Sequence, residues 1–163
     1  MKVKVGENAV LLLHPRNTVL VTCRGKDGRD NILAVSWCTP LSRKPPLIGI
    51  SIAPTRYSHK LIEESGEFIV NIPTMEILQK LHYCGTHSGR DVDKFGICKF
   101  TKLPGKKVHA SAIAECIAHL ECKVVKKVEV GDHTFFIGEV VEAYADEGVF
   151  EKTYRNIDKI GFI

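Results

Sequence analysis

Short apolar runs rich in β-branched residues follow one another through the first third of the chain, and turn residues separate them. Residues 18–23 and 31–38 flank Asp27-Gly28, a dipeptide that favours a tight β-hairpin. Residues 40–46, which include two consecutive prolines, predict a loop, and residues 47–52 predict a third strand. Strands this short and this regularly spaced indicate an antiparallel barrel or sandwich.

The next segment predicts a helix followed by a strand. Residues 57–64 have the pattern of a short helix that ends at Gly66, with Thr55 or Ser58 as its N-cap. Residues 67–72 predict a fourth strand. The local order is therefore strand, short helix, strand.

The second half of the chain adds one more helix and a long hairpin. Residues 74–83 predict a helix, and residues 84–100, rich in Gly, Ser and Asp, predict a surface loop. Residues 114–127 and 134–145 are rich in Val, Ile and Phe and predict a β-hairpin around a Gly-Asp-His turn. A loop or short helix and a tail are expected from residue 154 onward. The predicted fold class is mainly β with a few short helices.

Length and composition restrict the class of protein further. The 163 residues favour a single domain over residues 1–163, at about 100–200 residues per domain. The net charge of +4 comes from charges of both signs spread along the chain, so we expect no nucleic-acid surface. No stretch approaches the roughly 20 apolar residues of a membrane span. Six cysteines without a secretory leader predict reduced thiols in a cytoplasmic protein.

Two of the predicted strands carry only small side chains on one face. Side chains alternate across a strand, so the small face of residues 31–38 holds Ala34, Ser36 and Cys38. The small face of the third strand holds Gly49, Ser51 and Ala53. Such a face admits a flat cofactor close to the backbone. A helix or a partner subunit that packs closely on the sheet is the alternative explanation.

Two segments have the composition of an anion site. Arg56 lies between hydroxyl residues at the start of a predicted helix, where free N–H groups and an arginine fork suit a phosphate. Ser88, Arg90 and Lys94 form a second cluster. The alternatives are ordinary helix caps for the first segment and a charged surface loop for the second.

Other chemistries have weaker support. His82, Cys84 and His87 are potential metal ligands, but paired Cys-x-x-Cys spacing and a fourth ligand are missing. The chain has no Gly-x-Ser-x-Gly elbow, Walker-type loop or Gly-x-Gly-x-x-Gly fingerprint. These absences argue against hydrolases of that type, P-loop proteins and Rossmann dehydrogenases.

Four segments in order resemble the flavin reductase-like FMN-binding split-barrel family. They are NILAVSWCTP at 31–40 with the following Pro45-Pro46, SIAPTRYSHKLI at 51–62, GEFIVN at 66–71, and CGTHSGRDVDKF at 84–95. The resemblance covers roughly residues 17–141. It implies a six-stranded antiparallel Greek-key split barrel that works as a homodimer, with FMN near the subunit interface.

The resemblance also implies a set of FMN-binding residues and no catalytic side chain or metal. The isoalloxazine edge would be lined by Ala34, Val35, Ser36, Trp37, Cys38 and Thr39. The ribityl chain would pass over Ser51 and Ala53, and the phosphate would meet Arg56, Tyr57 and Ser58. The following loop would complete the site with Cys84, Gly85, Ser88 and Lys94.

The implied activity is hydride transfer from NADH or NADPH to flavin, with electrons passing on to free flavin, a ferric chelate or a protein partner. The cofactor carries the electrons while the protein binds and orients it. One alternative is an FMN electron carrier that does not oxidise NAD(P)H itself. A more remote alternative is an OB-like barrel that binds single-stranded nucleic acid. Aromatic residues make up only 7% of the chain, which disfavours that last function.

Overall fold

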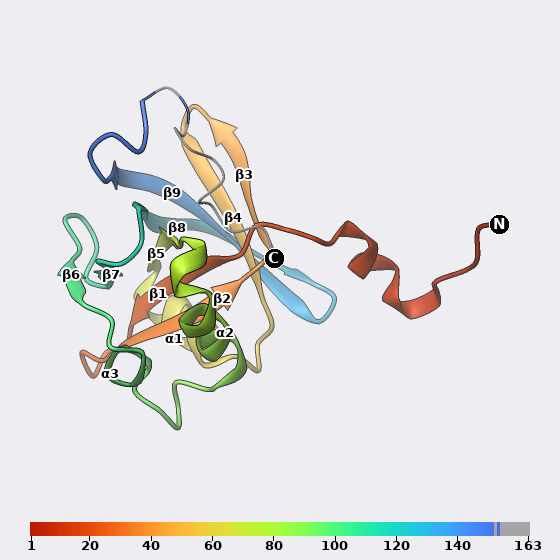
Figure 1. The fold of residues 1–163 in the computed structure, drawn as a ribbon, viewed down its shortest axis with the longest axis horizontal. Coiled ribbons are helices and arrows are strands. Elements are labelled where there is room, and N and C mark those ends of the chain that lie inside the picture. The colour runs from red at the N-terminus through yellow and green to blue at the C-terminus, as the bar shows by residue number, and fades with distance from the viewer. Residues whose placement is uncertain (152, 154–163) are drawn as a thin grey trace.

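Seven antiparallel strands form the main sheet of the computed structural model, which describes residues 1–151 and 153 (Figure 1). In order across the sheet they are β2 (Asp30–Val35), β1 (Val19–Arg24), β5 (Glu67–Ile72), β8 (Ala118–Val130), β9 (His133–Ala145), β4 (Pro46–Ile52) and β3 (Cys38–Arg43). A small second sheet pairs β6 (Lys102–Pro104) with β7 (Ser111–Ile113). The mainly β, antiparallel prediction is confirmed, but the main sheet has seven strands rather than six.

The strand predicted over residues 31–38 is in fact two strands, and this correction accounts for the extra strand. β2 ends at Val35, where it is still paired with β1. β3 begins at Cys38 and is paired with β4. The chain therefore changes partner strands at residues 36–37, a long-range choice that the local pattern does not contain.

The loop predicted over residues 40–46 is also wrong, because β3 continues to Arg43. Proline lacks an N–H and is excluded from central strands, but β3 lies at the edge of the sheet, where Pro40 needs no donor. The register of β3 against β4 shifts between Pro40 and Ser42. The turn that remains is Lys44-Pro45.

The helices in the described residues are short. They are η1 (Gly6–Leu13), α1 (Tyr57–Ser65), η2 (Met75–Ile77), α2 (Leu78–Thr86) and α3 (Lys94–Cys98). Gly66 ends α1 as predicted, with a φ of 69° in the left-handed region that glycine favours. The predicted N-cap at Thr55 or Ser58 is wrong: Arg56 occupies that position without a side-chain cap. Ser58 instead accepts a hydrogen bond from Asn31.

The segment 84–100, predicted as a surface loop, is partly buried. α2 runs on to Thr86, and α3 places Lys94, Phe95 and Cys98 in the interior. These residues had no clear apolar period in the sequence. Their burial depends on the sheet beneath them.

The apolar core has two main parts. Phe68 and Phe136 lie fully buried inside the curved main sheet. Ile32 and Leu81 belong to a second cluster between the sheet and the helices α2 and α3. The helices thus cover one region of the barrel and hold the end of β2 in place.

β8 and β9 form the long hairpin that the sequence predicted, with its turn at Gly131-Asp132. The tail predicted from residue 154 lies outside the described residues. None of the helices in the described part of the chain is long and apolar enough to cross a membrane.

Candidate functional site

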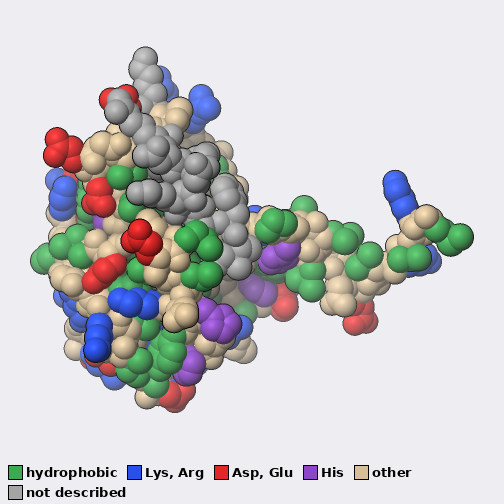
Figure 2. All heavy atoms as spheres, viewed as in Figure 1, with side chains coloured by type: hydrophobic (Ala, Val, Ile, Leu, Met, Phe, Trp, Pro, Cys, Tyr) green, Lys and Arg blue, Asp and Glu red, His purple; other side chains and the backbone are tan. Residues whose placement is uncertain are grey.

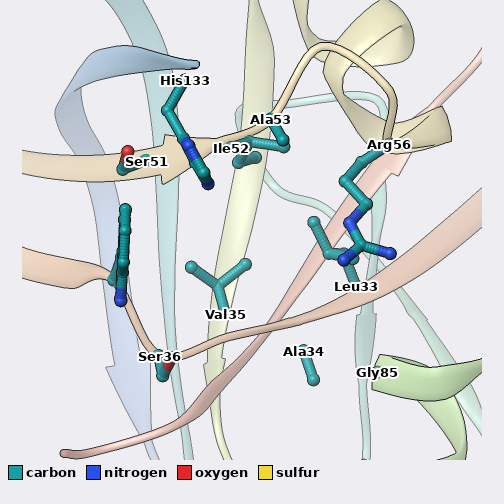
Figure 3. Close-up of a pocket in the computed structure, with 11 residues that line it drawn as sticks. Leu33, Ala34, Val35, Ser36, Ser51, Ile52, Ala53, Arg56, Gly85 and His133 are labelled. Carbon is teal, nitrogen blue, oxygen red and sulfur yellow. The ribbon is translucent and has the colours of Figure 1, made fainter. Parts of the chain in front are cut away.

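A cavity of about 180 Å³ opens where β2, β4 and the start of β9 meet (Figure 3). Figure 3 shows Ser51, Ala53 and His133 facing β2 across this space, with Arg56 at one end. Its lining residues are Leu33, Ala34, Val35, Ser36, Trp37, Ser51, Ile52, Ala53, Arg56, Gly85 and His133. We call this space the ring cavity.

Small residues keep the ring cavity shallow and close to the backbone. Ala34 and Gly85 face each other so closely that a Cβ on Gly85 would lie 3.3 Å from the Cβ of Ala34. Ser51 and Ala53 alternate with the core residue Ile52 along β4. The two predicted small faces therefore meet at one cavity, although α2 also packs beside Ala34, as the alternative explanation expected.

The small face of β4 is not bare along its whole length. The ring of Phe135 lies over Gly49, where an added Cβ would come within 2.0 Å of Phe135 Cζ. Gly49 is thus required by packing, and the open part of the face is confined to Ser51 and Ala53.

His133 and Trp37 form an aromatic wall of the ring cavity. Their ring centroids lie 4.7 Å apart at an interplanar angle of 31°. The exposed carboxylate of Asp132 lies 2.7 Å from Nδ1 of His133, and the imidazole lowers the pKa of this carboxyl group. With Nδ1 engaged, Nε2 is the ring nitrogen left for a ligand.

A second cavity of about 160 Å³ adjoins the ring cavity and shares Leu33, Arg56 and Gly85 with it. We call it the anion pocket. Its other lining residues are Asn31, Thr55, Tyr57, Ser58, Thr86, His87, Ser88, Gly89, Arg90 and Lys94. Three cations and no carboxylate line the anion pocket. In the described residues, no carboxylate pairs with any of the three.

Lys94 lies at the bottom of the anion pocket, 3% exposed. Its Nζ donates to the carbonyl oxygens of Ile32 and Cys84, at 2.7 Å each. Burial lowers the pKa of this ammonium group, and an anion beside it would oppose that shift. An ammonium group has three N–H bonds, so one remains for a ligand.

Arg90 and Tyr57 form the outer wall of the anion pocket. Arg90 Nη1 donates to the Thr55 carbonyl at 3.0 Å, and its guanidinium carbon lies 5.4 Å from the centre of the Tyr57 ring. At the base of α1, Asn31 Nδ2 donates to Ser58 Oγ at 2.7 Å. These contacts hold the wall in place before any ligand arrives.

The structure brings most of the predicted binding residues to one of the two cavities. At the ring cavity these are Ala34, Val35, Ser36, Trp37, Ser51, Ala53, Arg56 and Gly85. At the anion pocket they are Arg56, Tyr57, Ser58, Gly85, Ser88 and Lys94. Residues from four separate segments therefore lie side by side.

Three predicted residues line neither cavity. Cys38 and Thr39 belong to β3, beyond the bend at residues 36–37, and Cys38 packs against the core, where burial raises the pKa of its thiol to about 11. Cys84 is fully buried, with its Sγ 4.0 Å from that of Cys98, and burial raises the pKa of its thiol to about 12. Its carbonyl nevertheless holds Lys94.

Sequence reasoning missed His133 and did not include Arg90 among the binding residues. The Gly-Asp-His segment was interpreted only as a turn, yet His133 is the first residue of β9 and points into the ring cavity (Figure 3). Arg90 belongs to the cluster of Ser88, Arg90 and Lys94, and the anion-site composition of that cluster is the sequence signal for its role. The potential metal ligands do not converge, since His87 stacks on Tyr83 and no group of three metal-ligating side chains occurs in the described residues.

Comparison with known proteins identifies the class to which this fold and site belong. A sequence model described as the flavin reductase like domain matches residues 11–159. The chain therefore belongs to the flavin reductase-like family, as its sequence segments indicated.

Individual relatives support this assignment. The chain is 42% identical to an uncharacterised protein of Archaeoglobus fulgidus over 134 residues, which cover 82% of this chain and 75% of the relative. The structure superposes on flavoredoxin of Desulfovibrio vulgaris with a TM-score of 0.86 at 31% identity, covering 97% of this chain and 84% of that one. An NADH-dependent FAD reductase of Streptomyces globisporus is 29% identical, over 79% of this chain and 69% of its own length.

Proposed function

We propose that the protein binds FMN and acts as an NAD(P)H-dependent flavin or ferric reductase, working as a homodimer. The observation that carries the proposal is the junction of the ring cavity with the anion pocket through Arg56 and Gly85. A flat ring and a phosphate joined by a short polar chain match two such adjoining spaces. The family and its named relatives support a flavin-related redox function.

The residues present fit a flavin mononucleotide. Ala34, Ser51, Ala53 and Gly85 leave room against the backbone, while Arg56, Arg90 and Lys94 offer positive charge that no carboxylate of the pocket neutralises. A phosphate dianion suits such a donor set, because charge-assisted hydrogen bonds are the strongest that side chains make.

The neighbouring cavity favours FMN over FAD. Beyond Tyr57 and Arg90 lies a space of about 330 Å³ in which three cations face three carboxylates. Those residues are Arg29, Arg90, Lys102, Asp30, Asp91 and Asp93. Lys102 already pairs with Asp30 at 3.1 Å. Arg90 lines both spaces, but a second phosphate would also meet three carboxylates, whereas no carboxylate lines the anion pocket.

When bound, the flavin supplies a ring that accepts hydride from NADH or NADPH and releases electrons to an acceptor. The chain contributes position and electrostatics. Arg56, Arg90 and Lys94 hold the anionic end, and Trp37 packs beside His133 and limits its movement. His133, whose Nδ1 is hydrogen-bonded to Asp132, presents its Nε2 to the ring-cavity side.

The alternative of a pure electron carrier is separated from a reductase by one measurement. The purified protein is first reconstituted with FMN, and the released chromophore is identified by mass spectrometry. Anaerobic stopped-flow mixing with NADH and with NADPH then follows the oxidised flavin absorption. A reductase loses that absorption rapidly with one or both nucleotides, whereas a carrier keeps it. A protein that binds no flavin under any condition would overturn the proposal itself.

A further inference from the structure

The N-terminal segment projects away from the barrel, and every side chain of residues 1–15 is exposed (Figure 1). We call residues 1–17 the arm. Its 3-10 helix η1 has no buried residue. Figure 2 shows hydrophobic side chains along the arm well away from the body of the molecule.

The arm carries four consecutive aliphatic residues, Val10–Leu13, which are 53–69% exposed. An isolated helix of eight residues is marginal in water, and the second half of η1 consists of aliphatic residues alone. Exposed apolar surface of this kind marks an interaction site. The arm therefore needs a surface to cover it.

An apolar groove lies beside the root of the arm. Its volume is about 610 Å³, and its lining residues are Thr18, Ala34, Ser36, Leu78, Gln79, Leu81, His82, Gly85 and Thr86. No Asp, Glu, Lys or Arg lines the groove, and residues 8–13 of the arm are likewise uncharged. Groove and arm therefore match in chemical character.

The groove also forms one side of the candidate flavin site. Ala34, Ser36 and Gly85 line both the groove and the ring cavity. Whatever fills the groove therefore contacts residues that also line the ring cavity.

The arm of the same chain runs away from this groove. Arg16 Nε donates to the Ser36 carbonyl at 3.1 Å, which fixes the root of the arm at the rim, and residues 1–15 continue outward (Figure 1). Among the described residues of each copy, no surface covers Val10–Leu13 and no segment occupies the groove. Reciprocal exchange between two copies pairs both arms with both grooves in a closed two-fold arrangement.

We propose that Val10–Leu13 of one copy docks in the groove of a second copy, so that the arm of each subunit completes the ring cavity of the other. This inference rests on the homodimer of the proposed function and adds the segment that joins the subunits. It makes the flavin site a shared one.

Cysteine cross-linking between two singly substituted chains tests the exchange directly. Leu12→Cys places a thiol in the arm, and Gln79→Cys places one at the exposed edge of the groove. The two proteins are mixed and oxidised, with flavin and without it. We expect a disulfide-linked species at twice the 18.1 kDa chain mass. The matched control pairs Leu12→Cys with Lys60→Cys, an exposed position on α1 that does not line the groove, and no such species should form.

A single chain that carries both Leu12→Cys and Gln79→Cys shows whether the groove holds the arm of its own chain or that of a second copy. If it closes a disulfide within one chain while the mixture forms no linked dimer, the arm folds back on its own groove and the exchange is refuted. Absence of a specific link in both samples refutes docking altogether. Because the link is read without flavin, a failure of flavin binding does not affect the result.

A second experiment measures how strongly two copies of the chain associate. Leu12→Lys with Leu13→Lys should weaken dimerisation at least about 10-fold by sedimentation, since two apolar contacts are lost. Val3→Lys, in the same arm but outside the apolar run and 79% exposed, should leave it unchanged. FMN affinity at low protein concentration should fall together with dimerisation. Equal dimerisation constants for the unsubstituted protein, the double lysine variant and Val3→Lys would overturn the proposal.

Discussion

Charged side chains gather in two neighbouring regions of this molecule, and the two differ in how the charges are balanced. Around β6, β7 and their connection, three buried carboxylates are matched by donors from the protein itself; they belong to Asp30 on β2, Glu67 on β5 and Glu121 on β8. Asp30 accepts hydrogen bonds from Arg24, Lys102 and Ser111. Glu67 accepts from His109. Glu121 accepts from three consecutive backbone N–H groups, those of Lys106, Lys107 and Val108. In the anion pocket, Arg56, Arg90 and Lys94 have no carboxylate partner among the described residues.

The difference separates a structural use of charge from a functional one. A buried charge is tolerated when the fold supplies its partners, and the partners then fasten two segments together. Cations gathered without counter-charges repel one another, and a bound anion relieves this repulsion. Substitutions in the two regions should therefore fail in different assays, one in unfolding and the other in ligand binding.

The largest effect is expected from Asp30→Asn. The side chain of Asp30 is fully buried and joins the β1–β2 hairpin to β7 through Arg24 and Ser111. Removing its charge leaves donors without an acceptor and should lower the free energy of unfolding by about 3–5 kcal/mol. Urea unfolding of the flavin-free protein measures this. Asp27→Asn, which breaks the exposed pair with Arg29 in the same hairpin, is the control and should leave the free energy of unfolding nearly unchanged. If Asp30→Asn and Asp27→Asn lower the free energy of unfolding by similar amounts, the buried carboxylate has no special structural role.

Arg56→Ala should act on binding and leave the fold intact. Loss of a charge-assisted contact to the phosphate should weaken FMN binding by about 1.5–3 kcal/mol, roughly 10- to 150-fold, with riboflavin affinity nearly unchanged. The apo melting temperature should stay the same because Arg56 is exposed. Arg29→Ala, in the charge-balanced neighbouring cavity, is the control for FMN titration. If FMN and riboflavin lose equally, the phosphate lies elsewhere.

Lys94→Met should lower both stability and FMN affinity, since Lys94 is the buried cation of the pocket and its ammonium group also donates to two backbone carbonyls. Its removal leaves the Ile32 and Cys84 carbonyls without their donor and should cost about 1–3 kcal/mol of unfolding free energy. FMN affinity should fall as well. Calorimetry of the apo protein and flavin titration report the two effects separately. A variant that binds FMN normally would show that Lys94 has only a structural role.

The smallest effect concerns the pH dependence of stability. Burial favours the neutral form of Asp30, but hydrogen bonds from Arg24, Lys102 and Ser111 outweigh burial and hold its pKa below the usual value. The unfolded chain, with an aspartate pKa near about 3.9, then binds the proton more readily. The stabilisation is therefore complete above that value and is lost as pH falls through the lower folded pKa. Unfolding measured from about pH 6 to pH 3 should show a steeper loss in the native protein than in Asp30→Asn.

Elements with strong local signals were predicted closely. The strand over residues 67–72 matches β5, the helix over 57–64 matches α1 to within one residue, and Gly66 ends that helix. The long hairpin of β8 and β9 was also predicted, because apolar runs on both sides of a Gly-Asp turn leave few alternatives. In each case the evidence lies in the residues of the element itself and of the turn beside it.

Predictions failed where distant segments decide the outcome. The local pattern cannot show that the chain leaves β1 for β4 at residues 36–37, and this bend moved Cys38 and Thr39 away from the ring cavity. Likewise, Lys94 appeared as a loop cation because its acceptors, the carbonyls of Ile32 and Cys84, are 62 and 10 residues away. His133 was missed because a turn in the sequence becomes the wall of a cavity only when Trp37 packs against it.

By itself, the sequence determined the antiparallel β character, the small residues at positions 34, 51, 53 and 85, and the presence of two cationic segments, since residue type and spacing carry this information. Only the tertiary structure decided that the two cationic segments share one pocket without a carboxylate, and that a charge-free groove lies beside an exposed apolar arm. The reason is physical. Strand alternation and turn preferences are local, whereas the balance of charge and the covering of apolar surface depend on which distant segments meet.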